Sequence, residues 1–311
     1  MSEVAIGSGA PAMKTTVSRT LEGARTGVWA AVAFLVLGGG VAAGCDDSSE
    51  SSAGAQPSAS TTAAAPSAGL RVTDGAEPGE RAAASIKVAA AADLRSVLSA
   101  IRDELEAACN TGITFVFGSS GQLRTQIKAG ADFALYLSAD EAFTRELVDA
   151  GLVVPNGLAS YGVGRLAVAW RKGLAPIERL EDVARDDIRR LAIANPSHAP
   201  YGRAAKEALE RAGVYGAVER RLVYGENVRQ ATDYVEKGDA DAGIVALALV
   251  INTETPYWLI DASLHTPIAQ GGAVIRGTGG ELTGRCVLQY LLDDQGRAAL
   301  KRFGFEEPLH R

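Results

Sequence analysis

Cysteine, histidine, aromatic residues and excess positive charge are all scarce in this chain. Three cysteines are too few for a disulfide scaffold, and three histidines leave little for a zinc site or a histidine-based active site. The net charge of −6 argues against a nucleic-acid partner, because nucleic acids attract basic surfaces. With 6% aromatic residues and 35 glycines, the 311-residue chain is typical of an α/β protein rich in tight turns.

The common catalytic motifs are also missing. The sequence has no Cys-x-x-Cys, no His-Glu-x-x-His and no Walker A pattern. The segment from Gly118 to Gly121 does not have the Gly-x-Ser-x-Gly spacing of a nucleophile elbow. The glycines of Gly162 to Ala167 match a dinucleotide-binding pattern, but they precede a predicted strand instead of following one.

The three histidines, His198, His265 and His310, have no obvious Ser or Asp partner, and we expect exposed or capping roles for them. We therefore predict no catalytic residues and no enzyme activity. A lipoprotein hydrolase that uses Ser119 or Ser120 is the alternative from another class, although the sequence shows no convincing base for it.

The N-terminal segment has the features of an export signal. Arg19 and Arg25 precede an apolar run from Val28 to Val41, which is too short for a comfortable transmembrane span of about 20 residues. The run ends in Val-Ala-Ala-Gly before Cys45, an ending that resembles a bacterial lipobox. We therefore predict a lipoprotein signal peptide at residues 1–44 and a lipid on Cys45. An ordinary signal peptide with a chance cysteine and a short uncleaved anchor are the alternatives.

Residues 45–85 form a low-complexity segment of Ser, Ala, Thr, Gly and Pro with scattered acidic residues. Such a segment has too few large apolar side chains to offset the entropy lost on ordering. We therefore predict the lipidated cysteine followed by a disordered tether, which holds a folded domain near a membrane.

The two remaining cysteines, Cys109 and Cys286, lie in helical patterns. An exported protein reaches an oxidising compartment, so the two could pair. We expect two buried thiols instead, because free cysteine behaves as a small apolar residue.

From Ile86 onward, predicted strands and helices alternate. Apolar residues at i, i+3, i+4, i+7 and i+11 predict the first helix at Leu94, Val97, Leu98, Ile101 and Leu105. The expected strands are 86–88, 113–117, 133–137, 165–170, 191–193, 222–223, 242–245 and 268–275. Further helices are expected at 121–129, from 140, at 202–212, at 228–237 and within 281–303. Repeated βα units in two groups predict two parallel-sheet lobes with a ligand cleft between them.

Four of these helices begin just after a strand, two in each lobe. Their openings are Ala90–Asp93, Gly118–Gly121, Asn195–Gly202 and Gly225–Val228. Free backbone N–H groups and the positive end of the helix dipole make each opening a potential anion site. Taken singly, Asp93, Ser120 and Asn195 are better explained as ordinary N-caps. The convergence of four openings predicts one small oxyanion held by neutral donors.

At these residues the chain resembles the molybdate-binding proteins of ABC transporters, the ModA type. The first-lobe likeness lies in Lys87–Leu94, Phe117–Leu123 and Leu137–Glu141. The second lobe continues it through Tyr161–Leu166, Ala194–Gly202, Asn227–Val228 and Ala242–Ala246. The resemblance implies a type II periplasmic-binding-protein fold, an α/β architecture of two lobes with a hinge and an interlobe cleft. It places lobe 1 at residues 86–161 plus 268–311 and lobe 2 at 162–267.

The resemblance also implies which residues bind the ligand: Ala92, Asp93, Ser120, Tyr161, Tyr201 and Val228. Ser120 falls on the family's second-loop serine donor, and Tyr201 and Val228 fall on backbone N–H donors. Tyr161 matches a tyrosine at the lobe crossing, which some members use in place of a tyrosine that would fall on Ala246. For Tyr201 we expect the N–H to matter and the side chain to be irrelevant.

Asp93 departs from the family pattern, which has Ser, or Thr followed by Asn, at Ala92-Asp93. A carboxylate facing a dianion would be strongly repelled in a partly dry cleft. We therefore expect the side chain to turn inward and cap the helix, which leaves the backbone N–H to donate. A carboxylate pointing into the cleft would favour a protonated oxyanion instead.

The resemblance implies an exported solute-binding protein in the periplasm or at the cell surface, anchored by the lipid on Cys45. It would capture molybdate, and tungstate as a second ligand, by neutral hydrogen bonds and deliver it to an inner-membrane ABC permease. We expect a monomer without cofactor or nucleic-acid partner, holding molybdenum only as molybdate. The alternatives are another solute on the same fold (sulfate, phosphate, a phosphonate, or a cation on Asp93 and Tyr161) and a sensory binding subunit.

Overall fold

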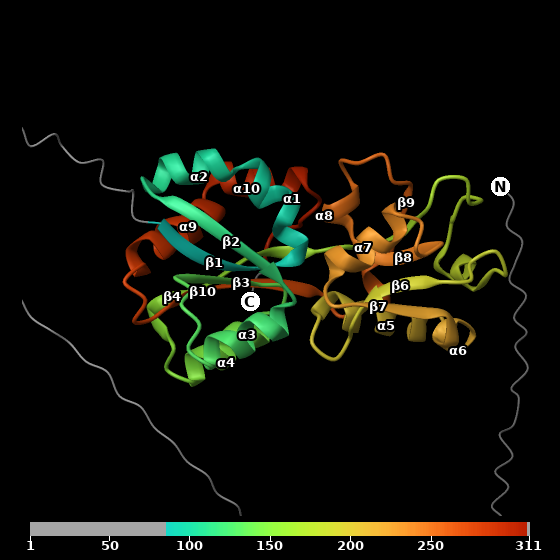
Figure 1. The fold of residues 1–311 in the computed structure, drawn as a ribbon, viewed down its shortest axis with the longest axis horizontal. Helices are drawn as coiled ribbons and strands as arrows, with labels where there is room; N and C mark the ends of the chain where they lie inside the picture. The colour runs from blue at the N-terminus through green and yellow to red at the C-terminus, as the bar shows by residue number, and fades with distance from the viewer. Residues whose placement is uncertain (1–84, 310–311) are drawn as a thin grey trace, which may run out of the picture. The chain divides into compact units, whose positions relative to one another are not determined.

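The structure is a computed structural model that describes residues 85–309. The predicted signal peptide, Cys45 and the predicted tether lie outside the described residues, except that Ser85 begins the first strand. Within the described range, no helix combines the length and the apolar character needed to cross a membrane. The chain from Ser85 onward builds two sheets, each with helices packed on it (Figure 1).

The first sheet has five strands in the order β2-β1-β3-β10-β4. Their bounds are β1 (Ser85–Ala91), β2 (Gly112–Gly118), β3 (Leu135–Ser138), β4 (Val153–Gly164) and β10 (Ile268–Ile275). Along β1, Val88 and Ala90 belong to one hydrophobic core and Ala89 to another. Because successive strand residues point to opposite faces, both faces of this sheet are buried.

Helices cover the two faces of the first sheet (Figure 1). On one face lie α1 (Arg95–Ala100), α2 (Arg102–Cys109), α9 (Glu281–Leu292) and α10 (Asp294–Arg302), and on the other lie α3 (Ser120–Lys128) and α4 (Glu141–Asp149). The apolar stripe predicted from Leu94 to Leu105 is fully buried, but the single helix predicted there is a 3-10 turn followed by α1 and α2, with Ile101 between the two helices. We call this sheet with its helices the first lobe.

The second sheet has the order β7-β6-β8-β5-β9. Its strands are β5 (Leu166–Trp170), β6 (Leu191–Ala194), β7 (Leu222–Gly225), β8 (Ala242–Ala246) and β9 (Tyr257–Leu259). One continuous core joins it to the helices α5 (Pro200–Arg211), α6 (Tyr215–Val218), α7 (Val228–Glu236) and α8 (Leu247–Val250). We call this sheet with its helices the second lobe.

Strand direction differs from the prediction in one respect. The α/β fold with two lobes is confirmed, but neither sheet is purely parallel. In the first sheet β10 is antiparallel to both neighbours, and in the second sheet β5 is antiparallel to both of its neighbours. These two strands lie at the points where the chain passes between the lobes, and such a strand enters its sheet from the opposite end.

The two passages between the lobes lie side by side. β4 ends at Gly164 and β5 begins at Leu166, so that Arg165 alone separates strands of different sheets. The returning strand β10 begins at Ile268, which pairs with Gly164. Glu306 forms a backbone bridge with Val163 and an ion pair with Arg165, and so ties the C-terminal segment to the same crossing.

Cys109 and Cys286 form a disulfide, with Cα atoms 5.8 Å apart. The prediction of two buried thiols is therefore wrong: both residues are partly exposed, and α2 and α9 contact each other on the same face of the first sheet. A helical pattern assigns each cysteine to a helix, but it carries no information on which helices become neighbours.

Candidate anion-binding site

Four helix starts meet at a small cavity between the lobes. They belong to α3, α5, α7 and η1 (Ala92–Leu94), a turn of 3-10 helix that follows β1. The cavity is lined by Ala91, Ala92, Asp93, Gly118, Ser119, Ser120, Ala139, Ala199, Pro200, Tyr201, Asn227 and Val228. The four predicted openings thus converge. Of the six predicted ligand residues, Tyr161 alone is not among those that line the cavity.

Local sequence determines where these helices start. Asn227 caps α7 by accepting a hydrogen bond from the N–H of Gln230 at 3.1 Å. Pro200 occupies the first position of α5, where the missing N–H has no cost. First-turn N–H groups have no partner inside their own helix, and the helix dipole adds positive potential there. The cavity can therefore attract an anion although no Lys, Arg or His lines it.

Ser120, at the first position of α3, is oriented by its hydrogen bonds to donate a hydrogen bond into this cavity. Its Oγ accepts a hydrogen bond from the N–H of Ala139 at 3.0 Å, and the side chain is 1% exposed. Its backbone carbonyl accepts from the hydroxyl of Tyr136 at 2.7 Å, which fixes the start of the helix. Because the oxygen is already accepting, the single hydroxyl proton of Ser120 is available for a ligand oxygen.

Asp93 turns inward, but it does not cap a helix. No side-chain cap is formed at the start of η1; the carboxylate Oδ2 instead accepts from the Tyr201 hydroxyl at 3.0 Å and from Gln270 Nε2 at 2.8 Å. The capping prediction is therefore wrong. Burial raises the pKa of Asp93 to about 6, against the lowering effect of the hydrogen bonds from Gln270 and Tyr201.

The side chain of Tyr201 also differs from its prediction, since it links the second lobe to Asp93 in the first. Tyr161 contacts Gln270 instead of Asp93: its hydroxyl is 2.9 Å from Gln270 Oε1 and 3.2 Å from the carbonyl of Ser138. Burial holds the pKa values of both tyrosines well above the usual range, with the nearby Asp93 adding to the effect. The two hydroxyls thus remain neutral donors.

Gln270 was not anticipated from the sequence. It is fully buried in β10, and its amide group bridges Tyr161 on one side to Asp93 on the other. A glutamine in a predicted strand carries no signal that separates it from an ordinary surface residue. Among residues 85–309, no cluster of His, Cys, Asp or Glu is arranged to hold a metal ion.

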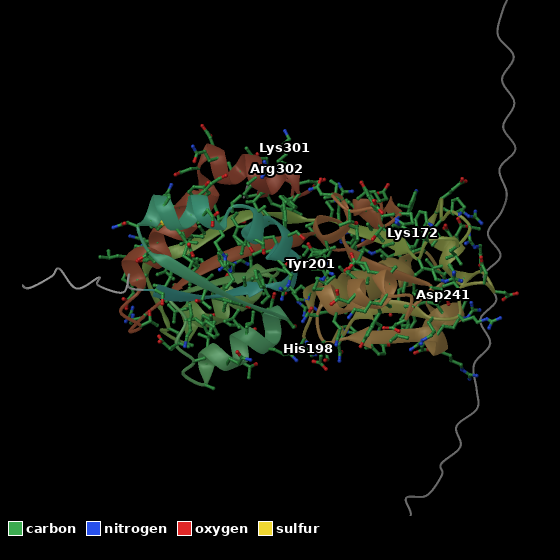
Figure 2. The ribbon with its side chains drawn as sticks, turned by 45° about the horizontal axis from the view of Figure 1, so that its top comes forward. Lys172, His198, Tyr201, Asp241, Lys301 and Arg302 are labelled. Atoms are coloured by element: carbon green, nitrogen blue, oxygen red, sulfur yellow. A yellow bond between two sulfur atoms is a disulfide. The ribbon has the colours of Figure 1, made fainter. Side chains whose placement is uncertain are left out.

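Further contacts hold the lobes together around the cavity. The carbonyl of His198 accepts from the Ser119 hydroxyl at 2.7 Å and from the Gly121 N–H at 3.0 Å. At the rim, Gln122 donates to Glu226 at 2.8 Å, and Arg203 of α5 forms an ion pair with Asp140. Figure 2 places Tyr201 and His198 where the two lobes meet. Both lobes therefore contribute to a closed arrangement.

His198 has a serine partner that the sequence did not indicate. Its Nδ1 lies 2.9 Å from Ser119 Oγ, and its Nε2 lies 3.9 Å from Glu226. The Ser119 hydroxyl donates its single proton to the His198 carbonyl, which leaves none for Nδ1. The pair is therefore an interlobe contact and lacks the geometry of a nucleophile with its base.

Comparisons with known proteins agree with this architecture. Residues 86–306 match the family model described as bacterial extracellular solute-binding protein. The molybdate-binding protein ModA of Rhodobacter capsulatus is 34% identical over 194 residues, which are 62% of this chain and 77% of that protein. ModA of Azotobacter vinelandii is 29% identical over 228 residues, which are 72% of this chain and 90% of that protein.

Solved structures give the same result. The periplasmic molybdate-binding protein of Azotobacter vinelandii matches with a TM-score of 0.68 and 26% identity, over 72% of this chain and 100% of that one. The sulfate-binding protein SubI of Mycobacterium tuberculosis matches with a TM-score of 0.60 and 18% identity, over 72% of this chain and 87% of that one. At that identity, the likeness to SubI is one of fold alone.

Proposed function

We propose, from the premise that this chain belongs to the family of bacterial extracellular solute-binding proteins, that its interlobe cavity captures molybdate, with tungstate as a second ligand. The relatives that carry the name molybdate-binding protein support this choice of anion. The protein delivers the anion to an ABC permease, is anchored by a lipid on Cys45 and performs no chemistry on its ligand. Export to the periplasm or cell surface follows from the same proposal.

The observation that carries the proposal is the free hydroxyl proton of Ser120 beside four helix starts. A tetrahedral oxyanion needs several donors around it, and first-turn N–H groups at Ala92, Asp93, Tyr201 and Val228 supply them from both lobes. Donors from both lobes are satisfied together only when the lobes are closed, so closure and capture are coupled. Tyr161 supports the site through Gln270.

Selectivity follows from size and from the donor set. Molybdenum–oxygen bonds are longer than sulfur–oxygen bonds, so a cavity fitted to molybdate leaves sulfate short of its donors. Leaving buried donors unpaired is costly, which turns a small difference in size into a large difference in affinity. Phosphate carries a proton at neutral pH and needs an acceptor for it, so exclusion of phosphate requires that Asp93, the acidic side chain at the cavity wall, does not accept that proton.

Calorimetric titration with molybdate, tungstate, sulfate and phosphate tests the proposal. We expect one-to-one binding of molybdate and tungstate and no binding of sulfate or phosphate. S120A should weaken molybdate binding by about 10- to 100-fold, because a hydrogen bond to a charged group is lost. S197A, at an exposed serine of the loop before α5, is the matched control and should bind as the wild type does. Binding of phosphate or sulfate alone would contradict the choice of ligand.

Closure has its own test at Gly121. A Cβ at this position would lie 2.6 Å from the carbonyl oxygen of His198 in the opposite lobe. We expect G121A to lower molybdate affinity by roughly 10- to 100-fold, because relief of an overlap worth about 1–3 kcal/mol requires the lobes to separate.

Thermal unfolding of the ligand-free protein should change little, since each lobe keeps its own core. Gly216 in α6 is the matched control, because a Cβ there would meet nothing within 4 Å. A G121A protein that binds molybdate as tightly as G216A would contradict a closed bound state.

A further inference from the structure

Asp93 is a buried acid in a cavity otherwise built from neutral donors. It lines the cavity and is 0% exposed. Its two side-chain hydrogen bonds, from Tyr201 and Gln270, go to Oδ2, and the nearby backbone N–H groups of Asp93 and Leu94 also lower its pKa. The other carboxyl oxygen, Oδ1, is buried without a hydrogen-bond partner among the described residues. An unpartnered oxygen at the wall of an anion site requires an explanation, because it should repel the ligand.

Within residues 85–309, no basic side chain pairs with Asp93. Besides α5 and β10, which supply Tyr201 and Gln270, the elements packed against η1 include α1, α7, α8 and β2, and the last two carry no titratable side chain. On α1, Arg95 is exposed and stacks on the ring of Phe117 at 4.6 Å. On α7, Arg229 pairs with Asp233 and Glu236, and Tyr234 is half-buried in the second-lobe core. The titratable groups that face the carboxyl are the neutral hydroxyls of Tyr201 and Tyr161.

We infer that Asp93 carries a proton on Oδ1 in the anion-bound protein and through it donates a hydrogen bond to the captured oxyanion, so that binding takes up one proton per anion. The proton comes from a hydronium ion or buffer acid in the solvent, whose bond to that proton breaks as an O–H bond forms on Oδ1. A carboxylic acid O–H then acts as the Ser120 hydroxyl does. This inference rests on the proposed function, and it makes Asp93 a specificity-determining residue of that site.

Electrostatics favours this state over a charged Asp93. A carboxylate and a dianion in one small cavity repel strongly, because little water separates them. Burial, opposed by the hydrogen bonds to the carboxyl, already raises the pKa of Asp93 to about 6 without an anion present, and a dianion beside it raises the pKa further. At neutral pH the free protein is therefore mainly ionised at Asp93, whereas the bound protein is protonated there.

The experiment counts protons during binding. Titration of the wild-type protein with molybdate at pH 7.5, in two buffers of different ionisation enthalpy, should give an uptake of about one proton per anion. The dissociation constant should rise about tenfold for each pH unit between 7 and 8.5, where molybdate itself stays fully deprotonated. On binding, an infrared band of a protonated carboxyl should appear.

D93N is the informative variant. Asparagine can accept from Tyr201 and Gln270 with its oxygen and donate with its amide, so it replaces the protonated acid without titrating. We expect molybdate binding by D93N to be independent of pH in this range, with no proton uptake. S120A is the matched control: it should bind molybdate more weakly but keep both the proton uptake and the rise of the dissociation constant with pH.

The outcomes separate the two proposals. Binding of molybdate by the wild type without proton uptake overturns the inference and leaves the proposed function intact. If the dissociation constant of D93N for molybdate still rises with pH, that result also overturns the inference. Failure of the wild type to bind molybdate, tungstate, sulfate and phosphate at every pH overturns the proposed function, and the inference falls with it. The wild-type proton count decides the question even if D93N fails to fold.

Discussion

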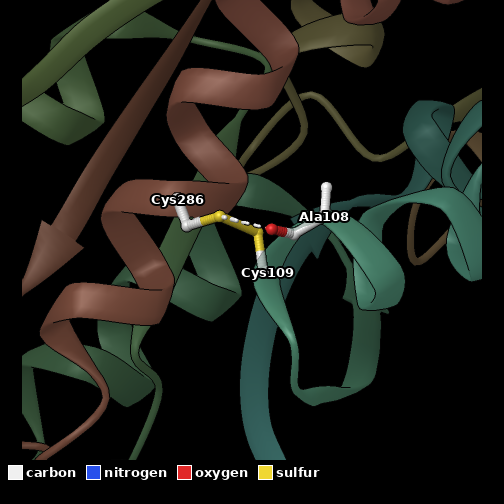
Figure 3. The surroundings of a disulfide bond; sticks show 3 residues. All are labelled: Ala108, Cys109 and Cys286. Atoms are coloured by element: carbon white, nitrogen blue, oxygen red, sulfur yellow. Dashed lines mark hydrogen bonds between the residues drawn. A yellow bond between two sulfur atoms is a disulfide. The ribbon is translucent and has the colours of Figure 1, made fainter.

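Replacing both Cys109 and Cys286 with serine is expected to lower the free energy of unfolding by about 2–4 kcal/mol. The two cysteines are 177 residues apart in sequence, and the disulfide joins α2 to α9 on one face of the first sheet (Figure 3). The segment between them includes the entire second lobe. A cross-link over so long a segment removes much conformational freedom from the unfolded chain.

Denaturant unfolding of the oxidised protein and of the double serine variant measures this difference. A reducing agent should lower the stability of the wild type by a similar amount and leave the variant unchanged. Molybdate affinity should be the same in both proteins, because the disulfide lies away from the cavity residues. Equal stability of the oxidised and reduced wild type would contradict the prediction. A stabilising disulfide also fits a protein that works in an oxidising compartment.

Periodic patterns made the alternation of strands and helices predictable, because buried faces repeat every two residues in strands and about every 3.6 in helices. The strand β4 was not predicted from such a pattern. It contains Pro155 and Gly157, which look like a turn, and its register with β10 shifts twice. β4 is an edge strand, where a proline is tolerated because its missing N–H breaks no hydrogen bond.

The candidate site was predictable only where local signals exist. Helix starts are marked by residues within four positions, so the openings at Ser120 and Val228 could be found from the sequence. The contacts of Asp93 could not, because Tyr201 is 108 residues away and Gln270 is 177 residues away. Contacts at such separation depend on how the lobes close. A resemblance to a family that has another residue at this position cannot supply them.

Ligand-free protein is expected to be more open at pH 8 than at pH 5, and Asp93 is the reason. Its pKa rises from 3.8 to about 6 in the closed arrangement, so the closed form binds this proton more tightly than a form with a hydrated carboxyl. That contribution to closure is complete below pH 3.8 and is lost as the pH rises through about 6. A shift of this size corresponds to about 3 kcal/mol.

Above about pH 6 the closed form has to bury an ionised Asp93 carboxylate. Opening the cleft removes this energetic cost, because water then reaches the carboxylate while each lobe keeps its own core. Small-angle scattering, or energy transfer between dyes on the two lobes, should therefore report an expansion between pH 5 and pH 8. D93N should stay closed across this range, since its amide does not ionise. H198Q tests another group at the lobe contact, His198, which lies 3.9 Å from Glu226, and this variant should still open as the pH rises. An expansion that persists in D93N and disappears in H198Q would assign the effect to His198 instead.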